Sequence, residues 1–195
     1  MIAIIDYGAG NIASVANALR ALNQEFILTN SAREIEKADK VIFPGQGEAS
    51  FAVKRLQETG LFELLQNCKK PVLGICLGLQ LLADGSKEGN VNCIGIIPGI
   101  NEKFDDKKTK VPHMGWNSIT IVKQSKLLNE IKSGENFYFA HSYYLPLNDS
   151  ATSTSENGIT FTASVEKDNY YGVQFHPEKS GDAGLKILRN FIEIC

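Results

Sequence analysis

One cysteine in this chain, Cys76, has neighbours that suit a nucleophile. It lies in the segment GICLG at residues 74–78, where a short apolar run gives way to a helical pattern. A nucleophile on such a sharp strand-to-helix turn has a strained backbone, and the flanking Gly74 and Gly78 let the strand and the helix approach closely. The start of the helix places partial positive charge near the sulfur, which favours the reactive thiolate. The backbone N–H of Leu77 points to where an oxyanion would form, so the pattern indicates acyl transfer.

A second group of residues supplies the base that a catalytic thiolate needs. Without such a base, Cys76 would more often be a small buried residue, because free cysteine is among the most buried residue types. His176 follows the strand-like run 171–175, and in sheets of this kind ligands and catalysis gather at the carboxyl ends of strands. Glu178 lies two positions further and projects to the same side, so it can orient the imidazole. The sequence thus predicts a triad of Cys76 as nucleophile, His176 as base and Glu178 as the orienting carboxylate.

Composition and length limit what else the chain can be. Its 195 residues, 43% hydrophobic and 22% charged, predict one domain over residues 1–195 with a sizeable core. The net charge is -2 and no basic stripe is present, which argues against a nucleic-acid partner. No apolar run approaches the roughly 20 residues that cross a bilayer, and residues 1–6 resemble a first strand rather than a signal peptide. We therefore expect no membrane association and a cytoplasmic location.

The cysteines and histidines do not suggest a metal site. Four cysteines have no C-x-x-C spacing and the histidines number three, so we expect free thiols, no zinc and no cofactor.

Hydrophobic periodicity predicts alternating strands and helices in the first half of the chain. Strands are expected at residues 1–5, 25–28, 41–43 and 71–75, and helices at 11–22, 49–58, 61–67 and 77–83. This order is typical of a parallel sheet with helices on its faces. The second half is rich in strand patterns, which we expect to add antiparallel strands to that sheet, before a last amphipathic helix at 183–194. The expected strands are 117–122, 136–144, 151–155, 159–165 and 170–175.

Two motifs together carry a family resemblance. The segments GICLGLQ at 74–80 and GVQFHPE at 172–178 resemble those of the triad-type, class I glutamine amidotransferases, in the same order and one hundred positions apart from cysteine to histidine. The resemblance implies the flavodoxin-like amidotransferase fold, with a mostly parallel central sheet, and hydrolysis of glutamine to glutamate and ammonia. It gives neither His113 nor His141 the role of the base.

The same resemblance implies the substrate contacts. The segment PGQG at 44–47 corresponds to the family's oxyanion strand, where glycines let backbone N–H groups approach a carbonyl. Gln46 stands where many relatives carry a small apolar residue, a change that a backbone donor tolerates. The implied contacts with glutamine are Gly45, Gln46, Gly47, Leu77, Gln80, Ser142 and Tyr143.

Three further segments narrow the resemblance to the branch that serves histidine biosynthesis. They are DYGAGNI at 6–12, VPHMGWN at 111–117 and FAHSY at 139–143, so the resemblance covers essentially the whole chain. It implies a heterodimer with a (β/α)8-barrel synthase subunit that uses the ammonia to make imidazole glycerol phosphate and aminoimidazole carboxamide ribotide. The glycines of the first segment are weak evidence for a phosphate loop, and we expect no nucleotide site there.

Three alternatives remain at this point. The chain could feed ammonia to a different acceptor, such as a synthase of a surface-sugar pathway, because the acceptor chemistry lies in the partner. It could be a noncatalytic regulatory module, whose mark would be loss of Cys76, His176 or Glu178, and all three are present. A cysteine peptidase would leave the glutamine-binding segments unexplained.

Overall fold

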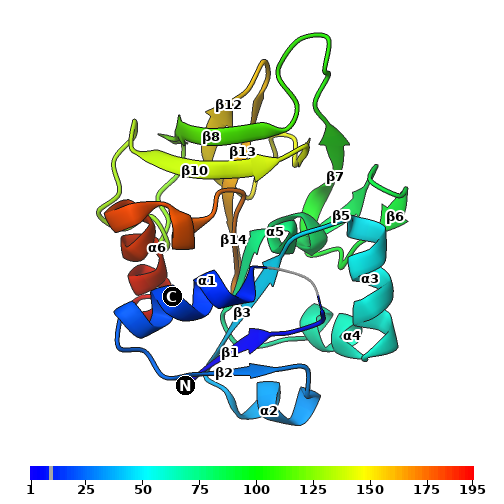
Figure 1. The fold of residues 1–195 in the computed structure, drawn as a ribbon, viewed down its shortest axis with the longest axis vertical. Helices are drawn as coiled ribbons and strands as arrows, with labels where there is room; N and C mark the ends of the chain where they lie inside the picture. Colours follow the sequence, from blue (N-terminus) through cyan, green and yellow to red (C-terminus); the bar gives the residue numbers. More distant parts are fainter. Residues whose placement is uncertain (9–10) are drawn as a thin grey trace.

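The computed structural model describes residues 1–8 and 11–195, and its centre is an eight-stranded sheet (Figure 1). The strand order is β2-β1-β3-β4-β14-β13-β12-β9. The strands are β1 (Ile2–Ile5), β2 (Phe26–Thr29), β3 (Lys40–Gly45), β4 (Val72–Cys76), β9 (Thr120–Ile121), β12 (Ala151–Glu156), β13 (Thr160–Lys167) and β14 (Tyr170–Val173).

The sheet has a parallel part and an antiparallel part, as the sequence predicts. Strands β2, β1, β3, β4 and β14 pair in parallel. Strands β13, β12 and β9 extend this sheet by antiparallel pairing beyond β14. The carboxyl ends of β1, β3, β4 and β14 therefore lie along one edge of the sheet, where the candidate triad also lies.

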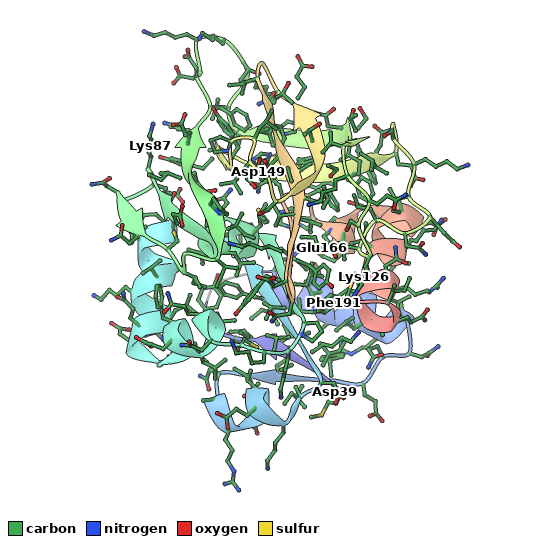
Figure 2. All side chains as sticks on the ribbon, turned by 180° about the vertical axis from the view of Figure 1, so that it is seen from behind. Asp39, Lys87, Lys126, Asp149, Glu166 and Phe191 are labelled. Carbon is green, nitrogen blue, oxygen red and sulfur yellow. The ribbon has the colours of Figure 1, made fainter. Side chains whose placement is uncertain are left out.

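Helices cover both faces of the parallel part, because its strands bury side chains alternately on each side. Ile2 and Ile4 face α1 and α6, while Ala3 and Ile5 belong to the core on the other face, with residues of α2, α3, α4 and α5. The helices are α1 (Ile12–Ala21), α2 (Ala32–Lys37), α3 (Ala49–Glu58), α4 (Leu61–Gln66), α5 (Leu77–Leu82) and α6 (Gly181–Glu193), with a 3-10 turn η1 (Pro177–Lys179). Figure 2 places Phe191 of α6, which is fully buried, against the sheet.

Two smaller sheets correct the sequence prediction. Strands β8 (His113–Ser118) and β10 (Asn136–His141) form a separate antiparallel pair instead of extending the central sheet, and of the run 117–122 only β9 joins it. The strand is interrupted at Ile119, whose side chain is fully buried. The segments on its two sides, β8 and β9, pair with different strands. The other sheet has the order β11-β7-β5-β6, with β5 (Ala83–Ser86), β6 (Val91–Asn92), β7 (Ile97–Lys103) and β11 (Tyr143–Tyr144).

Three sequence predictions need a separate statement. The glycine-rich turn expected at residues 6–11 includes Ala9 and Gly10, which lie outside the described residues. In the described part of the chain, no helix combines the length and apolar character that a membrane span requires. A single domain over residues 1–195 stays a prediction.

Candidate active site

The backbone at Cys76 has the strain that the sequence pattern predicts. Cys76 ends β4 and precedes α5, with φ 54° and ψ −108°. Positive φ is uncommon for a residue with a side chain, and such conformations cluster at functional sites. The side chain is 6% exposed, so the sulfur lies almost entirely inside the protein.

Close packing of glycines holds this turn in place. A Cβ added at Gly78 would lie 1.9 Å from the carbonyl oxygen of Phe43, and one at Gly74 would lie 2.7 Å from the carbonyl carbon of Gly78. Gly45 pairs in register with Cys76, and a Cβ there would lie 2.7 Å from the Cβ of Leu77. Because no side chain fits at these positions, β3, β4 and α5 approach each other more closely than other residues would allow.

His176 and Glu178 lie together behind the turn. The Nδ1 atom of His176 is 2.8 Å from Oε1 of Glu178, and the two side chains are only 4% and 1% exposed. The amide of Asn11, at the start of α1, donates to the same Oε1 at 3.4 Å. Both contacts are to this one oxygen of the carboxylate, which fixes the tautomer of the imidazole so that Nε2 is left for Cys76.

Opposing effects set the charge of His176. Burial alone lowers its pKa, but hydrogen bonds and the negative charges of Cys76 and Glu178 outweigh burial and raise the pKa to about 10. A cation beside a cysteine sulfur is a feature of reactive cysteine sites.

Three hydrogen bonds fix the segment that carries His176. Its backbone N–H donates to the Tyr138 carbonyl at 2.8 Å, and the hydroxyl of Ser180 donates to the His176 carbonyl at 2.6 Å. That hydroxyl also accepts from the Tyr138 N–H at 2.9 Å. Strand β10, which the sequence does not place near this segment, therefore positions the imidazole.

A cavity of about 230 Å³ opens onto Cys76. This volume is below the roughly 300–1,000 Å³ typical of sites for drug-sized ligands, and it suits a single amino acid. Seven residues expected from the sequence line it, and five others join them. The lining is Gln46, Gly47, Cys76, Leu77, Gln80, Glu88, Pro112, Met114, Ala140, His141, Ser142 and Tyr143.

The other three expected site residues lie outside this lining. Gly45 is packed beneath Leu77 and Gly78, so its contact is with the turn. His176 and Glu178 are behind Cys76 rather than in the cavity wall, where they can act on the sulfur and what is attached to it.

The remaining two histidines form a buried pair beside the cavity. Nδ1 of His113 lies 2.9 Å from Nε2 of His141, whose Nδ1 donates to the Tyr143 carbonyl at 2.8 Å. Burial, opposed by that bond and aided by the charges of His113 and His176, lowers the pKa of His141 to about 3. Burial lowers the pKa of His113 as well, so the pair is neutral at pH 7.

Sequence reasoning missed Glu88 and Gln174. Glu88 lines the cavity and accepts a hydrogen bond from the Ala49 N–H at 2.8 Å, while burial raises the pKa of its carboxyl group. No motif surrounds Glu88 in the sequence. Gln174 stands inside the second family motif, two positions before His176, and that position was the available signal.

The cysteine thiols are unpaired, and the described residues contain no metal-binding cluster. The four cysteines are free, and burial raises the pKa of Cys93 to about 12 and, with the charge of Glu166, that of Cys195 to about 11. Over residues 1–8 and 11–195, no cluster of three or more histidine, cysteine or acidic side chains is placed to hold a metal ion.

The fold and this site define a class of protein. The family model for class-I glutamine amidotransferases matches residues 3–195, and the chain belongs to that family. Imidazole glycerol phosphate synthase subunit HisH from Bacteroides fragilis is 45% identical over 195 residues, with 99% of each chain covered. The subunit of the same name from Haemophilus influenzae is 43% identical, covering 98% of this chain and 96% of its own.

A solved structure agrees on the fold. A glutamine amidotransferase crystal structure superposes with a TM-score of 0.75 over 99% of this chain and 98% of its own, at 16% identity.

Proposed function

We propose that the chain is the glutaminase subunit of imidazole glycerol phosphate synthase. It hydrolyses glutamine to glutamate and ammonia and supplies the ammonia to a synthase subunit in histidine biosynthesis. The observation that carries this proposal is a strained Cys76 on the floor of an amino-acid-sized cavity, with the buried His176–Glu178 pair behind it. The relatives do not favour the alternative acceptor from a surface-sugar pathway.

The first half of the proposed reaction forms a thioester. His176 takes the proton of Cys76, and the thiolate attacks the side-chain carbonyl carbon of glutamine. The oxyanion that results accepts hydrogen bonds from the free N–H of Leu77, in the first turn of α5, and from the segment Gly45–Gly47. His176 then gives its proton to the amide nitrogen, the carbon–nitrogen bond breaks and ammonia leaves.

The second half releases glutamate. Water loses a proton to His176 and attacks the thioester carbonyl, and the carbon–sulfur bond breaks. The thiolate of Cys76 leaves and is paired again with the imidazolium. Glu178 accepts the hydrogen bond from Nδ1 and stabilises the charged imidazole, as the carboxylate of a triad does.

The cavity wall supports a pose for the substrate. Glutamine carries an α-ammonium group, and the partly buried carboxylate of Glu88, which lines the cavity, is the acidic group that can receive it. Gln80, Ser142 and Tyr143 line the same cavity and supply polar groups for the amino-acid end. Binding that end holds the side-chain amide over Cys76.

An exposed apolar surface beside the cavity supports docking of the synthase subunit. Met114 and Trp116 are two positions apart on β8, so their side chains lie on the same face of the strand. The two residues are 64% and 59% exposed. Met114 also lines the cavity, and Trp116 contacts Tyr138 of β10 with ring centroids 6.2 Å apart. Exposed large apolar side chains grouped beside a site mark an interaction surface. We assign this surface to a synthase subunit with the (β/α)8-barrel fold. We also propose that the two subunits assemble in the cytoplasm.

A glutaminase assay tests the enzymatic part of the proposal. Purified chain, alone and with the barrel subunit of the histidine pathway and its nucleotide ligand, is given glutamine, and glutamate release is measured. We expect release that the partner stimulates and that Cys76→Ala abolishes. No release under either condition would refute the enzyme, and release by Cys76→Ala would refute the nucleophile.

A binding experiment tests the docking surface. Trp116→Ala should weaken association with the barrel subunit by tenfold or more, roughly the 1–2 kcal/mol of an aromatic anchor. Leu28→Ala is the matched control, because Leu28 is 48% exposed on β2, an edge strand of the central sheet, to which β8 does not belong. If calorimetry gives equal affinities for the two variants, Trp116 does not lie in the interface with the barrel subunit.

A further inference from the structure

The side chain of Gln174 touches the sulfur of Cys76 but has no part in the reaction steps above. Gln174 directly follows β14 and its exposed fraction is zero. Its Nε2 donates to Sγ of Cys76 at 3.6 Å. A primary amide has a donating end and an accepting end, so its effect on the sulfur depends on which end faces it.

Neighbouring groups decide that orientation. The carbonyl of Tyr143 can only accept, and it lies 2.7 Å from Nε2 of Gln80, so Gln80 must present its NH2 group there. The same Nε2 is 3.0 Å from Oε1 of Gln174 and donates its second hydrogen to it. The oxygen of Gln174 therefore faces Gln80, and its NH2 group faces the sulfur.

This orientation matters when Cys76 loses its proton. The neutral thiol can donate to the Ala140 carbonyl, which lies 3.9 Å from Sγ, but the thiolate has no hydrogen to donate and needs donors instead. Nε2 of Gln174 and the imidazolium of His176 both face the sulfur. A donor to an ionised acceptor in a buried, low-dielectric site is worth more than one in water.

We propose that Gln174 is a further catalytic residue, whose amide N–H stabilises the thiolate of Cys76, and that Gln80 is a positioning residue that fixes the orientation of this amide. The proposal deepens the function proposed above and rests on it for the role of Cys76. Gln80 then has two tasks, since it also lines the cavity, and the chain Tyr143–Gln80–Gln174–Cys76 connects the substrate end of the site to the nucleophile.

Alkylation of Cys76 by iodoacetamide tests the proposal in the free chain. The rate is followed by mass spectrometry of the Cys76 peptide from about pH 5 to pH 10, which reads the thiolate directly. Gln174→Met removes the donor at similar volume and adds no charge. We expect alkylation about tenfold slower at pH 7 and a profile displaced by about one pH unit to higher pH, as for loss of one bond to a charged group.

Two further variants separate chemistry from packing. Gln174→Glu keeps an oxygen for Gln80 but presents a second carboxylate oxygen to the sulfur. It should slow alkylation at least as much as Gln174→Met does. It should also lower kcat, while KM changes by less than about twofold. Asn190→Leu is the matched control, because Asn190 is a 5% exposed amide on α6 that donates to the carbonyls of Leu127 and Asn129. It should lower thermal stability and leave the alkylation profile unchanged.

The outcomes distinguish this inference from the proposed function. A Gln174→Met or Gln174→Glu protein that folds and has the wild-type alkylation profile, in a chain that releases glutamate, overturns the role of Gln174 alone. A wild-type chain whose Cys76 reacts no faster than Cys93 and Cys195, and which releases no glutamate, overturns the nucleophile and this inference together.

Discussion

Gly78→Ala is the sharpest test of the geometry around Cys76. Alanine is favoured over glycine in a helix by about 1 kcal/mol, so in open space this change would stabilise α5. Here the new Cβ would lie 1.9 Å from the carbonyl oxygen of Phe43, whereas ordinary contact begins at 3.4 Å, so α5 must retreat by about 1.5 Å from β3. Overpacking of this kind costs about 1–3 kcal/mol or more, which outweighs the gain in helix propensity.

The consequences for stability and rate follow from that retreat. After the gain of about 1 kcal/mol is subtracted, a net loss of up to about 2 kcal/mol lowers Tm by up to about 8 °C in a chain of this size. The retreat also moves the N–H of Leu77 and the sulfur of Cys76, and a misplacement of about 1 Å costs about a hundredfold in rate. We therefore expect kcat for glutamate release to fall by two orders of magnitude or so, while Tm falls by a few degrees.

The measurement needs a glycine control. Gly95→Ala meets no atom within 4 Å but has φ +76°, so it adds backbone strain of about 1–2 kcal/mol without moving α5. It should lower Tm and keep the wild-type kcat. A Gly78→Ala protein with the Tm and kcat of the wild type would refute the conclusion that contact with β3 positions the nucleophile.

Three further predictions concern pH and stability. The pKa of His176 is raised on folding from 6.5 to about 10. Its contribution to stability is therefore complete below pH 6.5 and is lost as pH rises through 10. Between these pH values, the free energy of unfolding measured in urea should fall more steeply in the wild type than in Glu178→Gln. The pKa of His141 is lowered on folding to about 3, so its contribution to stability is complete above pH 6.5 and is lost as pH falls through 3. On acidification, the wild type should therefore lose more free energy of unfolding than His141→Gln. Tyr170→Phe removes a buried hydroxyl that lies 2.7 Å from the Leu65 carbonyl and should cost about 1 kcal/mol in urea unfolding.

Each of these predictions has an outcome that contradicts it. Parallel curves for the wild type and Glu178→Gln between pH 6.5 and 10 would mean that the carboxylate does not hold the proton on His176. An acid limb unchanged by His141→Gln would mean that this imidazole is protonated in the folded chain. A Tyr170→Phe protein as stable as the wild type would show that the hydroxyl adds nothing to the attachment of α4 to β14.

Much of the fold was predictable because helix and strand periodicity is local. The helix at 49–58 has the predicted bounds, and the alternation of the first half correctly implied a parallel sheet. The separate β8–β10 pair was not predictable, because strand patterns state which residues alternate and not which strand they pair with. Short elements such as α2 and β6 were missed because too few residues carry a pattern there.

The sequence alone determined the family, the candidate triad and most of the cavity wall. Cys76 was identifiable because the glycines that its strained turn requires are its neighbours in the chain. The need for glycine at residue 74 is local, because a Cβ there would meet Gly78 and Leu79, whereas the need at residue 78 depends on the carbonyl of Phe43 in β3.

Tertiary structure decided everything that depends on contacts between distant segments. It brought Glu88 into the cavity, paired His113 with His141, and placed β10 against the backbone of His176. The orientation of the Gln174 amide is the clearest case, because a carbonyl 31 positions earlier, that of Tyr143, sets it through Gln80. Hydrogen-bond direction is a property of the folded network, and no local pattern of residues encodes it.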